Sequence, residues 1–168
     1  TGDGTTTVTV PISSITGNSI SVNSGGGNDS ITLGSTFAPG GAFAINIDGG
    51  SGTDSVTWDA TVATLSVDVQ SDTIVVNGNI STSGSDSVSM TAERDIVLNS
   101  GSSITTVAGN ITLTADDDDS GDGPLVIGGD LTSTGGSITV SGNNTSGIGV
   151  EVVGRTLSTT GTGAITID

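Results

Sequence analysis

The chain has 168 residues, and its 18 acidic against 2 basic side chains give a formal net charge of −16. Nucleic acid and anionic membranes carry the same sign of charge and are poor partners for such a chain. Because the chain has no Cys and no His, disulfide frameworks, zinc sites and histidine-based catalysis are excluded.

The composition favours a folded chain with an unusual core. The 28 Gly residues would suit a disordered linker, but 32% hydrophobic residues argue against disorder. Aromatic residues make up 2% of the chain, so the predicted core consists of aliphatic side chains. The chain starts at Thr1 without a basic-then-apolar leader, and no apolar run approaches the ~18 residues of a membrane helix. We expect a processed mature protein or a piece of a longer one.

The first internal repeat lies between residues 19 and 58. The segment SISVNSGGGNDSITL at 19–33 aligns with AINIDGGSGTDSVTW at 44–58, and every aligned pair differs by 25 (44 − 19). The turn glycines and one Asp are in register along with the apolar positions. Self-similarity of this length is typical of a solenoid or array.

A second, related repeat occupies residues 74–168. Ile111, Ile138 and Ile165 recur at an interval of 27 (138 − 111 and 165 − 138), and Leu131 follows Ile104 by the same interval (131 − 104). Each of four copies reads as an apolar-x-apolar pair, a single apolar residue and another apolar-x-apolar pair. This alternation places aliphatic residues on one face of short strands and hydroxyls on the other.

These patterns predict an all-β parallel β-helix with rungs of about 25–27 residues, which we expect to be right-handed. Strands this short are stable only when stacked ~4.8 Å apart, so that each rung pairs with the next. Roughly six rungs would form a rod on the order of 30 Å long. The predicted single module spans 1–168, with Gly/Asp turns in 1–72 and four degenerate repeats in 73–168. The alternative is a pair of immunoglobulin-like sandwiches, which would show no such register.

The glycine-rich turns carry a candidate metal motif. Residues 49–57 match Gly-Gly-x-Gly-x-Asp-x-apolar-x completely, residues 24–32 miss only the first Gly, and residues 81–89 form a degraded copy. The motif resembles the RTX repeat, and this resemblance implies Ca²⁺ bound by turn carbonyls and by Asp29, Asp54 and Asp86. The alternative is a tight turn in which Gly supplies a positive φ and Asp caps backbone amides.

A denser acidic loop spans residues 116–123. Its Asp118, Ser120, Asp122 and Gly123 reproduce the opening D-x-S-x-D-G of a calcium loop, and Asp116 precedes them. The closing Glu is missing at the expected distance. The alternative is a solvated acidic bulge that discourages sideways aggregation.

Two other functions fit the sequence poorly. An ice-binding face needs a regular Thr-x-Thr array, but Thr112 and Thr114 are followed by Thr139 with Ser141 and by Thr166 with Asp168. A polysaccharide-degrading enzyme could use paired carboxylates. However, the basic groups or aromatic platforms that bind sugars are missing, and the serines lack a His or Lys base. We therefore expect no enzymatic activity.

The segments GNITLTA at 109–115 and GGSITVS at 135–141 resemble the β-helical shafts of large secreted bacterial exoproteins, the filamentous-haemagglutinin-like adhesins and giant repetitive surface proteins. The resemblance implies an exported, cell-surface location and a role as spacer, stalk or filament material. An uncapped last strand at 165–167 predicts head-to-tail stacking on flanking repeats or neighbouring copies. The expected function is a structural module, with calcium as cofactor. A calcium-dependent module that binds a host or cell-surface glycan or other ligand is the alternative.

Overall fold

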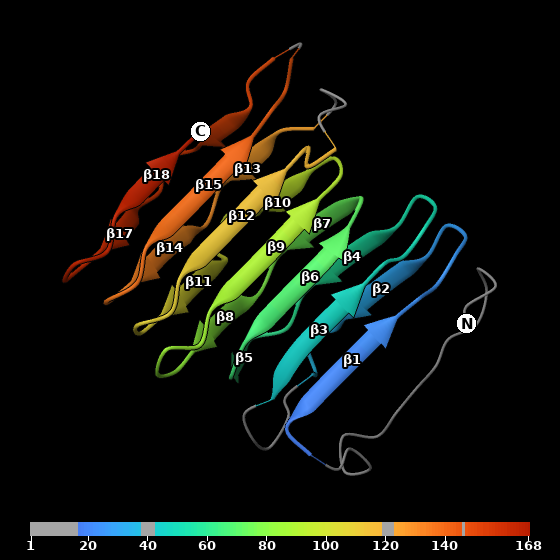
Figure 1. Cartoon of the computed structure of the whole chain (residues 1–168), viewed down its shortest axis with the longest axis horizontal. Coiled ribbons are helices and arrows are strands. Elements are labelled where there is room, and N and C mark those ends of the chain that lie inside the picture. The colour runs from blue at the N-terminus through green and yellow to red at the C-terminus, as the bar shows by residue number, and fades with distance from the viewer. Residues whose placement is uncertain (1–16, 38–42, 119–122, 146) are drawn as a thin grey trace.

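The computed structural model describes residues 17–37, 43–118, 123–145 and 147–168, and there the chain forms a β-solenoid of about six coils (Figure 1). Every strand pair in this part of the chain is parallel. These residues contain no helix, and hence none that could cross a membrane. The prediction of a parallel β-helix is confirmed, and the immunoglobulin-like alternative is wrong.

Three sheets form the sides of the solenoid. The seven-stranded sheet contains β1 (Ser19–Asn23), β3 (Ala44–Asp48), β6 (Val67–Ser71), β9 (Val88–Ala92), β12 (Ile111–Ala115), β15 (Ile138–Gly142) and β18 (Ile165–Ile167). The six-stranded sheet contains β2 (Ser30–Leu33), β4 (Ser55–Trp58), β7 (Thr73–Val76), β10 (Ile96–Leu98), β13 (Leu125–Ile127) and β16 (Val150–Val152). The five-stranded sheet contains β5 (Val62–Thr64), β8 (Asn79–Thr82), β11 (Ser103–Thr106), β14 (Asp130–Ser133) and β17 (Leu157–Thr159).

From β3 onward, successive strands belong to the seven-stranded, six-stranded and five-stranded sheets in turn, and the strands of each coil lie beside those of the coil before (Figure 1). Each side chain is therefore stacked on its equivalent one coil away. Ile111, Ile138 and Ile165 form one such interior column, and the first two are fully buried. Thr112 and Thr139 stack on the outside of the same strands, as the alternation predicted.

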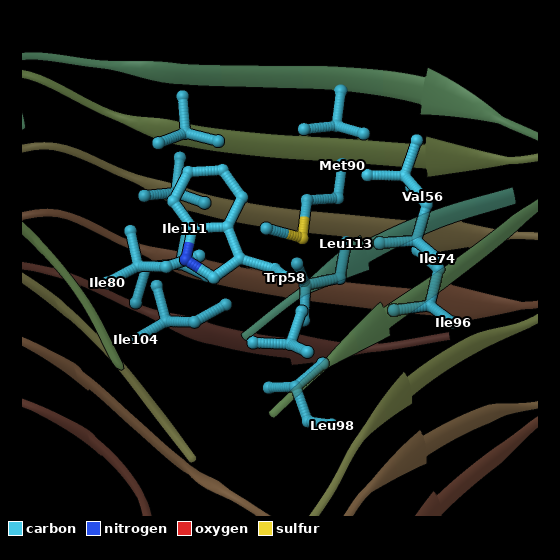
Figure 2. Packing of buried hydrophobic residues seen from close by; sticks show 14 of the residues in the cluster. Val56, Trp58, Ile74, Ile80, Met90, Ile96, Leu98, Ile104, Ile111 and Leu113 are labelled. Atoms are coloured by element: carbon cyan, nitrogen blue, oxygen red, sulfur yellow. The ribbon is translucent and has the colours of Figure 1, made fainter. Parts of the chain in front are cut away.

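The core is a continuous series of aliphatic columns with one aromatic ring. Trp58 stacks between Leu33 and Val76 in the six-stranded sheet. Its indole lies among branched aliphatic side chains and Met90 (Figure 2). A narrow interior of this kind is filled by branched residues that favour strands, and so needs few aromatic rings.

Coil length varies more than the repeats suggest. The offsets of 25 between β1 and β3 and of 27 between β12 and β15 follow the predicted register. In contrast, residues 54 and 72 occupy equivalent places on neighbouring coils only 18 residues apart. Parallel stacking requires only that equivalent positions align, so a coil with shorter turns fits between longer ones.

The last residue of each of four strands in the five-stranded sheet carries a buried hydroxyl, and these hydroxyls stack in one column. Four of its members are Thr64, Thr82, Thr106 and Ser133, all at most 5% exposed. Thr82 Oγ1 donates to the carbonyl of Asp86 (2.6 Å) at the turn into the seven-stranded sheet. The equivalent Thr106 and Ser133 hydroxyls both donate to Gly109 O (2.6 and 3.0 Å), in the turn that follows Thr106. The hydroxyls thus satisfy turn carbonyls that have no strand partner.

We expect Thr106→Val to lower the free energy of unfolding by about 1 kcal/mol, because the buried bond from its hydroxyl to Gly109 O (2.6 Å) is lost while the volume is kept. Thr105→Val is the matched control, since its side chain faces outward on the same strand. Urea unfolding followed by circular dichroism measures both. Equal stabilities of the two variants would contradict a structural role for the hydroxyl column.

Candidate functional site

The two glycine-rich turns predicted from the sequence stack directly on each other. They connect the seven-stranded to the six-stranded sheet on consecutive coils, at residues 24–29 and 49–54. Ser51 N donates to Gly25 O (2.8 Å), and Gly27 N donates to Ser51 O (2.9 Å). The turns therefore continue the parallel pairing of the strands around the corner.

Glycine is required in the second turn by both conformation and space. Gly50 has φ +87° and Gly52 has φ +136°, values that L residues rarely adopt. A Cβ at either position would lie 1.9 Å from a carbonyl oxygen of the first turn, that of Gly25 or Gly27. The turn function of the Gly-rich motif is thus explained by backbone packing.

The aspartates of these turns form a column that extends one coil further than the motif. Asp54, which is 1% exposed, accepts a hydrogen bond at Oδ1 from Asp29 N (2.8 Å). Asp54 N in turn donates to Oδ2 of Asp72 (2.7 Å). The aligned register of the two repeats thus places Asp29 beside Asp54. Asp72 was missed because the short third coil lacks the Gly-rich motif that reveals the register.

This corner concentrates unpaired polar atoms. In the described part of the chain, the buried side-chain oxygens without a hydrogen-bond partner are Asp29 Oδ2, Asp54 Oδ2 and Ser71 Oγ. Asp29 and Asp54 lie in the turns between the seven-stranded and six-stranded sheets on two consecutive coils, and Ser71 is the last residue of β6 on the next coil. Buried polar groups are normally paired, so this group is the strongest candidate site in the described residues.

Asp86, the Asp of the degraded third motif, lies at a different corner. It follows β8 and precedes β9, on the turn from the five-stranded to the seven-stranded sheet. Asp86 N donates to Ser83 O (3.2 Å), and its carbonyl accepts the Thr82 hydroxyl. The structure therefore does not bring Asp86 together with Asp29 and Asp54.

The acidic loop begins at the same corner as the glycine-rich turns, several coils further on. Asp116 is 2% exposed and has φ +56°, and its amide donates to Arg94 O (3.0 Å). Asp118 is exposed. Ser120 and Asp122 of the predicted calcium loop lie outside the described residues.

An acidic depression of about 140 Å³ lies on the outside of this corner. Its lining includes four carboxylates that sequence reasoning did not select, which are Asp48, Asp72, Glu93 and Asp117. Each lies at the end of a strand of the seven-stranded sheet or just after it. This shared position can be recognised only when the register between the coils is known. Among the described residues, no three Asp or Glu side chains are placed to hold a metal ion by themselves.

No protein-family model matches the chain, and no curated protein or solved structure matches it either. The fold therefore rests on the strand pairing and the column packing described above. The site chemistry rests on its own atoms, which are oxygens of carboxylates and a hydroxyl. Such donors favour hard cations.

Proposed function

We propose that this chain is a structural β-solenoid module of an extracellular bacterial adhesin, filament or surface-layer protein, that calcium stabilises it, and that its coils stack end to end. In this role the module acts as a spacer or stalk, without catalysis. The observation that carries the proposal is the parallel pairing of equivalent strands over about six coils around one aliphatic interior.

The side chains of the last coil continue buried columns but are exposed. Ile165 and Ile167 of β18 are 43% and 54% exposed, whereas Ile138 and Val140, their equivalents one coil earlier, are fully buried. Strands β16, β17 and β18 each pair on one side within the described residues. A further parallel coil, from a flanking repeat or a neighbouring copy, would pair these edges and cover the apolar cross-section.

The charge of the chain supports calcium as the stabilising ion. A net charge of −16 on a rod with one or more acids on most coils opposes compaction, and bound cations reduce that repulsion. Extracellular calcium modules bind with dissociation constants of about 10⁻⁴ to 10⁻³ M. The proposed extracellular location thus fits a site that is filled only at calcium concentrations in this range.

End-to-end stacking is tested by changing the exposed edge. We expect the wild-type protein to form rods that lengthen with protein concentration in millimolar CaCl₂, as seen by analytical ultracentrifugation and negative-stain electron microscopy. Ile167→Asp should leave single modules, because a charge then lies on the apolar cross-section. Thr166→Asp is the matched control, since Thr166 stacks on Thr139, whose side chain lies outside the apolar column. A wild-type protein that stays a single module at every concentration would contradict stacking between copies.

A further inference from the structure

The outer face of the seven-stranded sheet, which forms one side of the solenoid (Figure 1), changes its chemistry along the rod. On β9, β12 and β15 two outward positions per strand carry hydroxyls, which are those of Ser89, Thr91, Thr112, Thr114, Thr139 and Ser141. The equivalent positions on β1, β3 and β6 carry amides, carboxylates and one hydroxyl, on Ser21, Asn23, Asn46, Asp48, Asp68 and Gln70. We call these six residues the polar face.

The residue types of the polar face do not favour the strands that carry them. Thr is enriched in strands, whereas Asn and Asp are depleted. The side chains of Asn46, Asp68 and Gln70 make no hydrogen bond with any described residue, so no contact within the fold compensates for this. Residues that disfavour their own strand without a gain in packing are expected at functional sites.

The polar face is a shallow depression of about 230 Å³. The parallel register arranges its side chains in two rows along the rod, one of Ser21, Asn46 and Asp68 and the other of Asn23, Asp48 and Gln70. Neighbours within a row are ~4.8 Å apart, and the rows are separated by two residues of extended strand, or ~7 Å. Both spacings are of the order of the distances between hydroxyls on a sugar ring and its neighbour.

Part of the polar face is held in place before any ligand binds. Asp48 Oδ2 accepts a hydrogen bond from Asn23 Nδ2 (2.8 Å), and its Oδ1 accepts one from Gly50 N (2.9 Å). These bonds fix the orientation of both side chains on a rigid sheet. Such preorganisation lowers the entropic cost of binding.

The chemistry of the polar face selects the class of ligand. Amides donate and accept hydrogen bonds and carboxylates accept them, so together they match hydroxyl groups, which do both. Asp48 and Asp68 repel anions, and no basic side chain lines the depression. It also presents no aromatic ring and no large exposed apolar side chain, the usual anchors of a bound peptide. A neutral, hydroxyl-rich ligand remains.

We propose that the polar face binds a neutral glycan, which lies across β1, β3 and β6 and exchanges hydrogen bonds with Asn46, Asp68 and Gln70. An open face gains affinity through repeated weak contacts, which favours a polysaccharide over a single sugar. Glycan binding goes beyond the proposed structural role and requires neither calcium nor stacking. It would let the side of a stalk attach to a polysaccharide surface.

Affinity gel electrophoresis of the whole chain at neutral pH with EDTA tests the proposal. The neutral probes are hydroxyethyl cellulose, laminarin, dextran and galactomannan, and polygalacturonate is the acidic probe. We expect at least one neutral polysaccharide to retard the protein in proportion to its concentration in the gel. Polygalacturonate should not retard it, because its carboxylates are repelled.

Substitution by Thr, the residue that later coils carry at the same positions, makes the test specific. Asn46→Thr and Gln70→Thr should each raise the dissociation constant about fivefold, the order expected for a lost hydrogen bond. Their Tm values should equal or exceed that of the wild type, because Thr favours strands. Asn79→Thr is the matched control, since it replaces an outward-facing amide on β8 of the five-stranded sheet. It should change the affinity less than twofold.

Wild-type affinity in both Asn46→Thr and Gln70→Thr would overturn the assignment of glycan binding to the polar face. A lower Tm in these variants without weaker binding would give the amides a structural role instead. The absence of retardation by all four neutral polysaccharides would likewise overturn the proposal. A protein that does not stack, or that calcium does not stabilise, would contradict the proposed structural role and leave this result unchanged, since the electrophoresis contains EDTA and does not depend on stacking.

Discussion

Gly136→Ala should lower the free energy of unfolding by about 3 kcal/mol, although it adds a single methyl group. The added Cβ would lie 2.1 Å from the carbonyl oxygen of Gly109 and 2.5 Å from its carbonyl carbon. Both atoms belong to the backbone of the preceding coil, so no side chain can rotate away. Relief requires the two coils to separate, which weakens the parallel pairing on both sides.

The neighbouring glycine provides the control. A Cβ at Gly135 would have its nearest contact at 3.5 Å, an ordinary van der Waals distance. Gly135→Ala should therefore be neutral or stabilise slightly through the unfolded chain. For a chain of this size, 3 kcal/mol corresponds to a decrease in Tm of about 6 to 12 °C. Thermal unfolding by circular dichroism measures the difference, and equal Tm values for the two variants would contradict the close approach of these turns.

Trp58→Ala should cost about 3 to 5 kcal/mol of stability. The side chain is fully buried, stacks in the column of Leu33 and Val76, and donates from Nε1 to Ala60 O (3.0 Å). Figure 2 shows the indole extending across the interior toward side chains of other sheets. Its removal leaves a cavity that the strand backbones, each paired on both sides, cannot close.

Two further substitutions identify the source of this loss. Trp58→Phe should recover much of the stability, because a ring still fills the interior while the bond to Ala60 O is lost. Thr57→Ala, on the outward face of the same strand, should change stability by less than about 0.5 kcal/mol. Guanidinium unfolding followed by far-ultraviolet circular dichroism measures all three. A Trp58→Ala protein as stable as Thr57→Ala would contradict the packing described here.

The stacked glycines show how much of the fold can be read from the chain alone. Gly109, Gly136 and Gly163 recur every 27 residues, the same interval as Ile111, Ile138 and Ile165. The 27-residue spacing of these isoleucines correctly predicted that their strands stack on one another, because the alternation in each strand places its apolar residues inside. The reason for the glycine interval, a backbone that approaches too closely for a Cβ, required the structure.

The candidate site was predicted only in part. The matching turns indicated the register, which places Asp29 beside Asp54. The roles of Asp72 and Ser71 were not predicted, because the third coil has short turns and no motif that aligns with its neighbours. Asp86 shares the motif pattern with Asp54 but lies at another corner, since a degraded motif does not record which sheets its turn connects.

The sequence by itself determined that the chain is an all-β stack of short parallel strands with an aliphatic interior. Strand alternation and a repeat near 26 residues depend only on the order of residues along the chain, so both can be recognised without the structure. The tertiary structure decided the corner at which each turn lies and which polar atoms remain without partners. Those properties depend on the length of every preceding coil, because one shorter coil changes which residues meet while the pattern within each strand stays the same.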